Sequence, residues 1–266
     1  MSKDDLYSLE NARRFGWASI TGQLNPARVS VLEAQLVGEK ILDAGCSGGA
    51  YAEFAASLNH SVVGVDRYEA FLKLALQGTH CATYVQGDLM RLPFADRTFD
   101  STYCFDVLEH VDDEAALREL ARVTRKRLIL VVPQENLWLE KYGLTFYHYI
   151  DPTHLRYYTE ESFGKLIAKI NPAQITLIPD QPVHWNMIIR DMVEEEIPPM
   201  QPSAMLSPSV ILRAVKYLAE GVTDRKGFKL KSSLAKAKRN SFIKQLSGIS
   251  FKPIYMELIA IVELAQ

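Results

Sequence analysis

The chain is 266 residues long, with 48% hydrophobic and 23% charged residues. This balance is typical of a folded globular protein and excludes a disordered, collagen-like or disulfide-stapled chain. Lys and Arg together number 30 against 32 Asp and Glu, which gives a net charge of −2. Such a charge supplies no overall basic field, so no DNA partner is expected.

The cysteines and the first residues indicate the compartment. Cys46, Cys81 and Cys104 are odd in number, widely spaced and set among apolar residues, as expected for reduced thiols. The N-terminus carries acids where a secretion signal needs a basic start, and no apolar run reaches the ~18 residues of a transmembrane segment. We therefore expect a cytoplasmic protein. No motif indicates its oligomeric state.

The pattern predicts four regions along the chain. Residues 1–37 form an N-terminal helical cap of two helices, the second opened by Asn25 and a proline. Residues 38–185 alternate short apolar runs with helical segments, which is typical of a Rossmann-like α/β core with a mostly parallel sheet and helices on both faces. Residues 186–250 are expected to form a helical lid insertion, and residues 251–266 supply the final strand of the core sheet.

Seven strands are expected in the sheet, each a short apolar run. They are residues 40–44, 61–66, 81–86, 99–105, 127–132, 174–179 and 255–264. One helix should begin at the acids 112–114 and end at the basic residues 125–127, because these charges match both ends of the helix dipole. Another should run from Thr159, a capping residue, to Ile170.

The predicted insertion segregates its charges. Acids gather at residues 191–196, and eight basic residues gather at residues 225–244. The basic end is suited to a phosphate, a carboxylated acceptor or an anionic membrane surface, although a solvated helical face is the simpler explanation.

The segment I-L-D-A-G-C-S-G-G-A-Y-A, residues 41–52, joins a strand to a helix through a glycine-rich turn. Gly45 and Gly49 lack the Cβ atoms that would keep a ligand away, and the helix presents unpaired N–H groups at its start. A nicotinamide-binding turn requires a second glycine that is missing here, and Asp43 would repel a phosphate. The turn therefore suits a cationic ligand, and a nucleotide-dependent oxidoreductase is the less favoured alternative.

Four ordered motifs resemble those of class I S-adenosylmethionine-dependent methyltransferases. D-A-G-C-S-G-G, residues 43–49, resembles the first motif, with Ser47 in place of the middle glycine. Asp66 follows Gly45 by 21 residues, where the family places the acid that binds the ribose hydroxyls. Y-V-Q-G-D-L-M-R-L-P-F, residues 84–94, resembles the third-strand motif, and F-D-S-T-Y-C-F-D-V-L-E-H-V, residues 99–111, resembles the fourth-strand motif of the ubiquinone- and menaquinone-type branch, with Asp100 in register.

The resemblance covers residues 40–133 and, less specifically, residues 154–163; it implies S-adenosylmethionine as cofactor. The implied cofactor-binding residues are Asp43, Gly45, Cys46, Ser47, Gly49, Asp66, Arg67, Asp88, Leu89 and Phe105. Each has a structural alternative: Asp43 and Asp66 can cap the helices that follow, Asp88 can form a turn, and Phe105, like Phe94, can belong to the core.

Methyl transfer from a sulfonium requires a nucleophile held close to the methyl carbon in a partly dehydrated site. If the acceptor is a hydroxyl, a histidine can take its proton, and His110 and His154 are the candidate catalytic residues. His110 can instead simply bond to the backbone at a helix entrance.

A metal site is the second implication of the resemblance. D-V-L-E-H, residues 106–110, resembles the acid-x-x-Glu-His motif with which some O-methyltransferases of the family hold a divalent ion. The implied ligands of an ion such as Mg²⁺ are Asp106, Glu109, His110 and His154. Asp106 is shorter than the usual glutamate, and Glu109 can form an ion pair or a cap instead.

Aromatic residues gather after the predicted fifth strand. They are Trp138, Tyr142, Phe146, Tyr147, His148, Tyr149, Tyr157 and Tyr158. Ligands of open α/β sheets lie beyond the carboxyl ends of the strands, so this cluster is the candidate acceptor pocket, although any single ring can serve packing instead.

Together these patterns predict a methyltransferase that uses S-adenosylmethionine and acts on a small-molecule acceptor, with a preference for a hydroxyl oxygen. Transfer to nitrogen, to carbon or to an RNA end stays open as an alternative. So does a non-catalytic protein that binds the cofactor.

Overall fold

The computed structural model describes residues 8–14, 17–78, 81–135, 153–183 and 254–265. The chain divides into two compact units. The first contains residues 1–135, 148–181 and 257–266, and the second contains residues 136–147 and 182–256. Nearly all described residues belong to the first unit, and the predicted lid at 186–250 lies outside the described residues.

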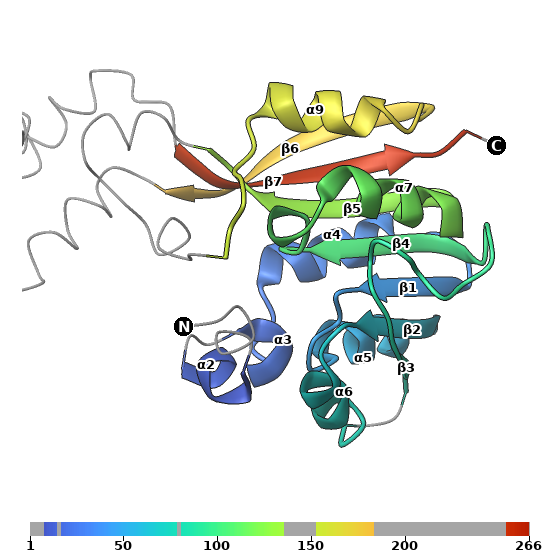
Figure 1. Cartoon of the computed structure of the whole chain (residues 1–266), viewed down its shortest axis with the longest axis vertical. Helices are drawn as coiled ribbons and strands as arrows, with labels where there is room; N and C mark the ends of the chain where they lie inside the picture. The colour runs from blue at the N-terminus through green and yellow to red at the C-terminus, as the bar shows by residue number, and fades with distance from the viewer. Residues whose placement is uncertain (1–7, 15–16, 79–80, 136–152, 184–253, 266) are drawn as a thin grey trace, which may run out of the picture. The chain divides into compact units, whose positions relative to one another are not determined.

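A seven-stranded sheet forms the centre of the first unit, in the order β3-β2-β1-β4-β5-β7-β6 (Figure 1). The strands are β1 (Lys40–Ala44), β2 (Ser61–Asp66), β3 (Thr83–Gln86), β4 (Phe99–Phe105), β5 (Thr124–Pro133), β6 (Gln174–Val183) and β7 (Ile254–Glu263). The β1–β2, β1–β4, β2–β3 and β4–β5 pairs are parallel, and β7 runs antiparallel to β5. The prediction of a Rossmann-like, mostly parallel sheet is confirmed.

The helices flank these strands in the chain. They are α2 (Leu9–Arg14), α3 (Ala18–Thr21), α4 (Pro26–Gln35), α5 (Ala50–Ser57), α6 (Glu69–Ala75), the 3-10 helix η1 (Leu108–His110), α7 (Asp113–Val123) and α9 (Glu160–Ala168). Three helices, not the expected two, precede β1 among the described residues. The start predicted at Asn25 is correct, because its side chain accepts a hydrogen bond of 2.9 Å from Ala27 N.

Successive strand residues point to opposite faces, so each face has its own core. On one face, Leu42, Leu128 and Leu130 pack with apolar residues of α7 and α9. On the other face, Ile41 and Ile129 pack with residues of α4 and α5. Helices therefore cover both faces, as predicted from the alternating pattern.

Helix α7 ends earlier than predicted. It stops at Val123, and Thr124 begins β5, paired with Phe99. The basic residues expected to close the helix lie in the strand instead, where Arg125 and Lys126 form ion pairs with Asp100. Burial of Thr124 in the sheet outweighs the favourable placement of positive charge at a helix end.

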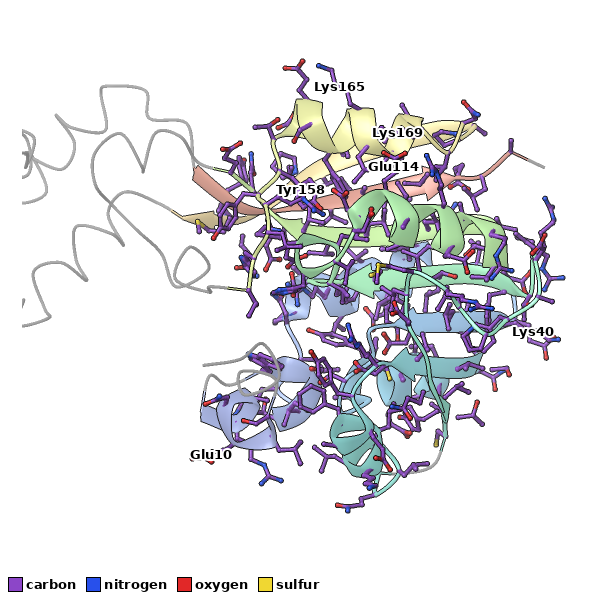
Figure 2. All side chains as sticks on the ribbon, in the orientation of Figure 1. Glu10, Lys40, Glu114, Tyr158, Lys165 and Lys169 are labelled. Atoms are coloured by element: carbon purple, nitrogen blue, oxygen red, sulfur yellow. The ribbon has the colours of Figure 1, made fainter. Side chains whose placement is uncertain are left out.

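Helix α9 begins as predicted and ends slightly earlier. Thr159 and Ser162 form a reciprocal capping box at its start. Lys169, just after its last residue, forms an ion pair with Glu114 of α7, and Figure 2 shows the two labelled side chains together. This pair ties the two helices of one face to each other.

The ends of the strands define where a ligand would bind. The parallel strands β1, β2, β4 and β5 end at one edge of the sheet, and the antiparallel β7 begins there, with Glu257 opposite Pro133. In open α/β sheets, ligands bind beyond this carboxyl edge. Among the described residues, no helix is both long and apolar enough to cross a membrane.

Candidate functional site

The glycine-rich turn follows β1 at the carboxyl edge. Gly45 and Gly49 have φ angles of 88° and 80°, in the left-handed region that favours glycine. Ser47, where the resembling motif carries glycine, also has a positive φ, of 48°. A Cβ atom on Gly45 would collide with Val107, and one on Gly49 with Tyr84. The glycines therefore allow the turn to pack closely against Val107 and Tyr84.

Two buried acids flank this turn. Asp66 is 7% exposed, and its carboxylate accepts hydrogen bonds from Ser47 N at 2.9 Å and from Tyr68 N at 2.8 Å. Burial raises the pKa of Asp66 against the opposing effect of these backbone bonds. Asp66 does not cap α6, whose N-cap residue is Tyr68 and has no side-chain cap bond. The carboxylate instead connects the turn after β1 to the end of β2. Its remaining lone pairs can still accept bonds from a ligand.

Asp43, the other acid, is 4% exposed. Its Oδ2 atom and the Oγ atom of Ser47 have no hydrogen-bond partner among the described residues. Burial raises the pKa of Asp43 to about 8, and nearby Asp66 acts in the same direction. A cationic or hydrogen-bond-donating ligand would lower the cost of ionising Asp43, because it would pair with this buried carboxylate.

The other expected cofactor residues lie around this turn in different environments. Cys46 is buried, and Arg67 is exposed. Asp88 accepts a hydrogen bond of 2.9 Å from Met90 N, so it forms the turn that was the structural alternative, while Leu89 is buried in the core. Phe105 packs edge-on against Tyr51, with ring centres 5.5 Å apart.

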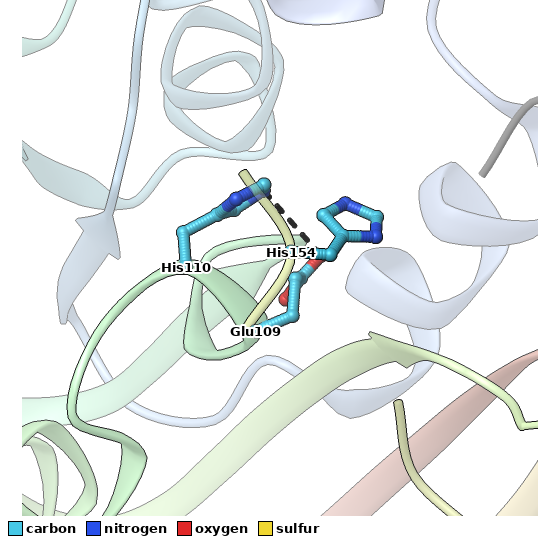
Figure 3. Close-up of side chains that lie close together, drawn as sticks. All are labelled: Glu109, His110 and His154. Atoms are coloured by element: carbon cyan, nitrogen blue, oxygen red, sulfur yellow. Dashed lines mark ion pairs between the residues drawn. The ribbon is translucent and has the colours of Figure 1, made fainter. Parts of the chain in front are cut away.

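A second cluster lies after β4, where Glu109, His110 and His154 meet (Figure 3). One candidate ligand atom from each lies within 4.8 Å of the others. Glu109 is 1% exposed, its Oε2 atom has no hydrogen-bond partner among the described residues, and burial raises its pKa well above the usual value. His110 Nε2 lies 3.8 Å from Glu109 Oε1, and the ring centres of His110 and His154 are 4.6 Å apart.

Residues 153–158 hold His154 in this cluster. Leu155 N donates to Glu109 O at 2.8 Å, and Thr153 Oγ1 lies 3.0 Å from His110 Nδ1. Arg156 donates to Val111 O at 2.7 Å. These bonds fix the segment against the 3-10 helix η1 and leave His110 Nε2 facing the carboxylate of Glu109.

Asp106, the fourth expected metal ligand, has a different partner. It forms an ion pair of 2.7 Å with Arg28 of α4 and has a φ of 54°. The group of possible metal ligands contains Glu109, His110 and His154 without it. Arg28 also pairs with Glu257 of β7 at 2.7 Å. The sequence patterns identified neither Arg28 nor Glu257 as a member of a buried charged cluster. One signal was present for Glu257, which is the one acid inside the apolar run Ile254–Val262.

Of the aromatic residues predicted to form an acceptor pocket, the structure describes only Tyr157 and Tyr158. Trp138, Tyr142, Phe146, Tyr147, His148 and Tyr149 lie outside the described residues. Tyr158 is 3% exposed, packs against Phe163 and donates a hydrogen bond to Asp113, so this ring belongs to the core. Tyr157 lies with its ring centre 5.4 Å from that of His154, beside the Glu109–His110–His154 cluster.

Comparison with known sequences matches residues 42–132 to a family described as a methyltransferase domain. A ubiquinone biosynthesis O-methyltransferase from Hahella chejuensis is 34% identical over 111 residues, which cover 39% of this chain and 47% of that protein. The homologous enzyme from Idiomarina loihiensis is 27% identical over 63% of this chain and 81% of its own length. A demethylmenaquinone methyltransferase from Paenarthrobacter aurescens is 33% identical over 46% of this chain and 51% of that protein. The chain thus spans about half the length of the first and third of these relatives.

Solved structures share the fold over nearly the whole chain. A SAM-dependent methyltransferase from Archaeoglobus fulgidus superposes with a TM-score of 0.59 at 16% identity and covers 97% of this chain and 99% of its own. A phosphoethanolamine N-methyltransferase from Haemonchus contortus gives a TM-score of 0.58 at 17% identity, over 98% of this chain and 58% of its own. The chain therefore has the fold of these S-adenosylmethionine-dependent methyltransferases, and its residues 42–132 match the methyltransferase-domain family and are similar in sequence to ubiquinone and menaquinone methyltransferases.

Proposed function

We propose that this protein binds S-adenosylmethionine at the turn after β1 and transfers its methyl group to a small-molecule acceptor. The observation that carries this proposal is the buried pair of acids, Asp43 and Asp66, on either side of a turn built on left-handed glycines. The donor is a cation with two ribose hydroxyls, and this site offers the unpartnered Oδ2 atom of Asp43 and the remaining lone pairs of Asp66.

Each residue of this turn would have a separate task. Asp66, held by two backbone bonds, would accept hydrogen bonds from the ribose with its remaining lone pairs. Asp43 would compensate positive charge of the donor, and Gly45 would let the ligand approach the backbone. Because the sulfonium is already reactive, the protein's main contribution would be to orient donor and acceptor and to exclude water.

For the acceptor we propose a hydroxyl oxygen. The ubiquinone relatives are named as O-methyltransferases, and the His110–His154 pair lies at the carboxyl edge beside the proposed donor site. A nitrogen, a carbon or an RNA end as acceptor would need the same donor site. The fold therefore does not distinguish these alternatives, and the methylated product has to be identified.

The function is tested by methyl transfer. The purified protein is incubated with isotopically labelled S-adenosylmethionine and a fractionated metabolite extract, and the fraction that gains the label is identified by mass spectrometry. We expect one small molecule to be methylated on oxygen. Labelled RNA, or a product methylated on nitrogen or carbon, would change the acceptor. Binding of the cofactor without transfer to any fraction would favour a non-catalytic protein.

We also propose that Glu109, His110 and His154 hold a divalent ion. The fit rests on the unpartnered, buried Oε2 atom of Glu109 and on ligand atoms within 4.8 Å of one another. Mixed carboxylate and imidazole ligation suits ions such as Mn²⁺ or Zn²⁺ and accommodates Mg²⁺ less readily. Such an ion would act as a Lewis acid toward an acceptor oxygen, while the chain's own residues hold the imidazoles in place.

The metal proposal has its own test. Calorimetric titration of the chelator-treated protein with Mn²⁺ should show one site, which Glu109→Gln removes. Glu119→Gln, on helix α7, is the matched control, because Glu119 binds Arg122 and lies outside the cluster. Equal titrations of the wild type and Glu109→Gln would contradict the site.

A further inference from the structure

A buried group of charged side chains lies at the carboxyl edge, outside the proposed donor site. Arg28 of α4 forms ion pairs with Glu257 Oε1 of β7 and with Asp106 Oδ2, both at 2.7 Å. Its guanidinium carbon lies 5.6 Å from the centre of the Phe105 ring. Glu257 is 2% exposed, and its second oxygen, Oε2, has no hydrogen-bond partner among the described residues.

This charged group is continuous with the turn at which the donor is proposed to bind. Val107 fills the space that a Cβ atom on Gly45 would occupy, so the segment after β4 touches the glycine-rich turn. Asp106 precedes Val107 and is bound by Arg28, which in turn binds Glu257. Contacts therefore run from the donor turn across the edge of the sheet to the unpartnered oxygen of Glu257.

The free oxygen of Glu257 indicates which chemical group would meet it. A buried carboxylate oxygen without a donor is costly, and such atoms in folded proteins normally have a partner. Arg28 binds the other oxygen of the same carboxylate, which fixes its orientation. A hydroxyl group fits the remaining oxygen, Oε2, because it can donate the hydrogen bond that this oxygen lacks.

We propose that Glu257 is the catalytic residue that accepts the proton of a hydroxyl acceptor during methyl transfer, with Arg28 as its positioning residue. This inference rests on the proposed function and adds the acceptor's half of the reaction. The hydroxyl oxygen forms a bond to the methyl carbon, the carbon–sulfur bond breaks, and its electron pair stays on the sulfur of S-adenosylhomocysteine. The hydroxyl proton moves to Glu257 Oε2, so the carboxylate becomes a neutral carboxylic acid as the sulfonium loses its charge.

The charges around Glu257 are consistent with this role. Burial raises its pKa to about 7, Asp106 acts in the same direction, and Arg28 opposes the shift. Asp180 of β6 also raises this pKa, and Glu109 of η1 is electrostatically linked to the same group. A carboxylate with a pKa near neutrality is a better proton acceptor than an exposed one, and a substantial fraction of it is ionised at neutral pH.

The test separates this step from cofactor binding. Binding of S-adenosylhomocysteine is measured by calorimetry, and transfer from labelled donor to the metabolite extract is measured for the wild type and Glu257→Gln. We expect Glu257→Gln to bind the nucleoside within about twofold of the wild type and to transfer the methyl group about 100-fold more slowly. Glu263→Gln is the matched control, because Glu263 lies on the same strand and pairs with Arg127 at the opposite edge; it should keep the wild-type rate.

A second variant covers the case in which Glu257→Gln does not fold. Glu257→Asp keeps the carboxylate but withdraws it by one methylene, so we expect about tenfold slower transfer with unchanged cofactor affinity. A wild-type rate in either variant, or a product methylated on nitrogen, would overturn the proposal. Failure of the wild type to bind S-adenosylhomocysteine would instead refute the proposed function itself.

Discussion

Arg28 and Glu257 lie 229 positions apart in the sequence and form an ion pair of 2.7 Å, with side chains only 10% and 3% exposed. The same guanidinium binds Asp106 at the end of β4. One side chain therefore joins an N-terminal helix, the turn after β4 and the last strand. Helix α4 of the N-terminal region is thus tied to the carboxyl edge of the sheet.

Loss of this guanidinium should strongly destabilise the protein. Arg28→Leu leaves Asp106 and Glu257 without compensation, so we expect the free energy of unfolding in urea to fall by about 3–5 kcal/mol. Arg127→Leu is the control, because its partner Glu263 has a 35% exposed side chain, and its loss should cost about 1 kcal/mol. Equal losses in the two variants would contradict a buried network around Arg28.

Asp43 should make the unliganded protein less stable as the pH rises. Its pKa in the folded state is about 8, above the ordinary value of 3.8. The folded state therefore retains a proton that the unfolded state releases, and stability falls between about pH 4 and pH 8. Asp43→Asn should remove this decline and be more stable than the wild type at the upper end of the range. Urea unfolding of both proteins at several pH values measures this dependence of the free energy of unfolding on pH.

Asp100→Asn should behave in the opposite way. At Asp100, burial is outweighed by hydrogen bonds from the Lys40 and Glu39 nitrogens, so its pKa is lowered. Its contribution to stability is present at neutral pH and is lost as the pH falls through the lowered pKa. The variant should therefore lose stability at neutral pH. A similar pH dependence in the two variants would contradict the assignment of opposite shifts.

Gly45→Ala should abolish cofactor binding, because it deforms the glycine-rich turn after β1. The new Cβ atom would collide with Val107, and the φ of 88° adds backbone strain of about 1 kcal/mol. Gly22→Ala is a matched control, because Gly22 has a φ of 75° but nothing within 4 Å of the added atom. Calorimetry with S-adenosylhomocysteine should show binding by Gly22→Ala only; retained binding by Gly45→Ala would show that the turn tolerates displacement.

Thr153→Val should slow methyl transfer without changing cofactor affinity. The variant removes the hydroxyl that lies 3.0 Å from His110 Nδ1, which orients the imidazole toward Glu109. We expect transfer to fall about tenfold, as for other groups that orient a functional histidine. Thr98→Val, which removes an exposed hydroxyl bond to Ala95 O, should leave the rate unchanged. An equal rate in both variants would contradict an orienting role of Thr153 in catalysis.

Much of the sheet could be predicted from local sequence. The bounds of β1, β2 and β4 match the predicted ranges, because each strand is a short apolar run with a glycine or an aspartate at or just after its end. The end of α7 could not be found in this way. The basic residues after it resemble a helix terminus, but Arg125 and Lys126 meet Asp100 only once the sheet has formed.

The candidate site residues that lie in short sequence motifs could be predicted. Those that depend on contacts between residues far apart in the sequence could not. The glycine-rich turn and Asp66 lie in motifs with fixed spacing. The contact between Arg28 and Glu257 depends on the folding of the whole unit, and no local pattern marks Arg28 as buried. Asp88, by contrast, accepts a hydrogen bond from Met90 N, and this contact could be predicted from the local preference of aspartate for turns.

The proposed donor site is tested most directly by calorimetric titration with S-adenosylhomocysteine. Three proteins are compared: the wild type, Asp66→Ala and Asp100→Ala. Both acids accept two backbone hydrogen bonds, but Asp100 lies at the opposite edge of the sheet. We predict that the wild type and Asp100→Ala bind, and that Asp66→Ala binds about 100-fold more weakly through loss of the ribose bonds. Absence of binding by the wild type, or equal affinity in all three proteins, would contradict a nucleoside site between β1 and β2.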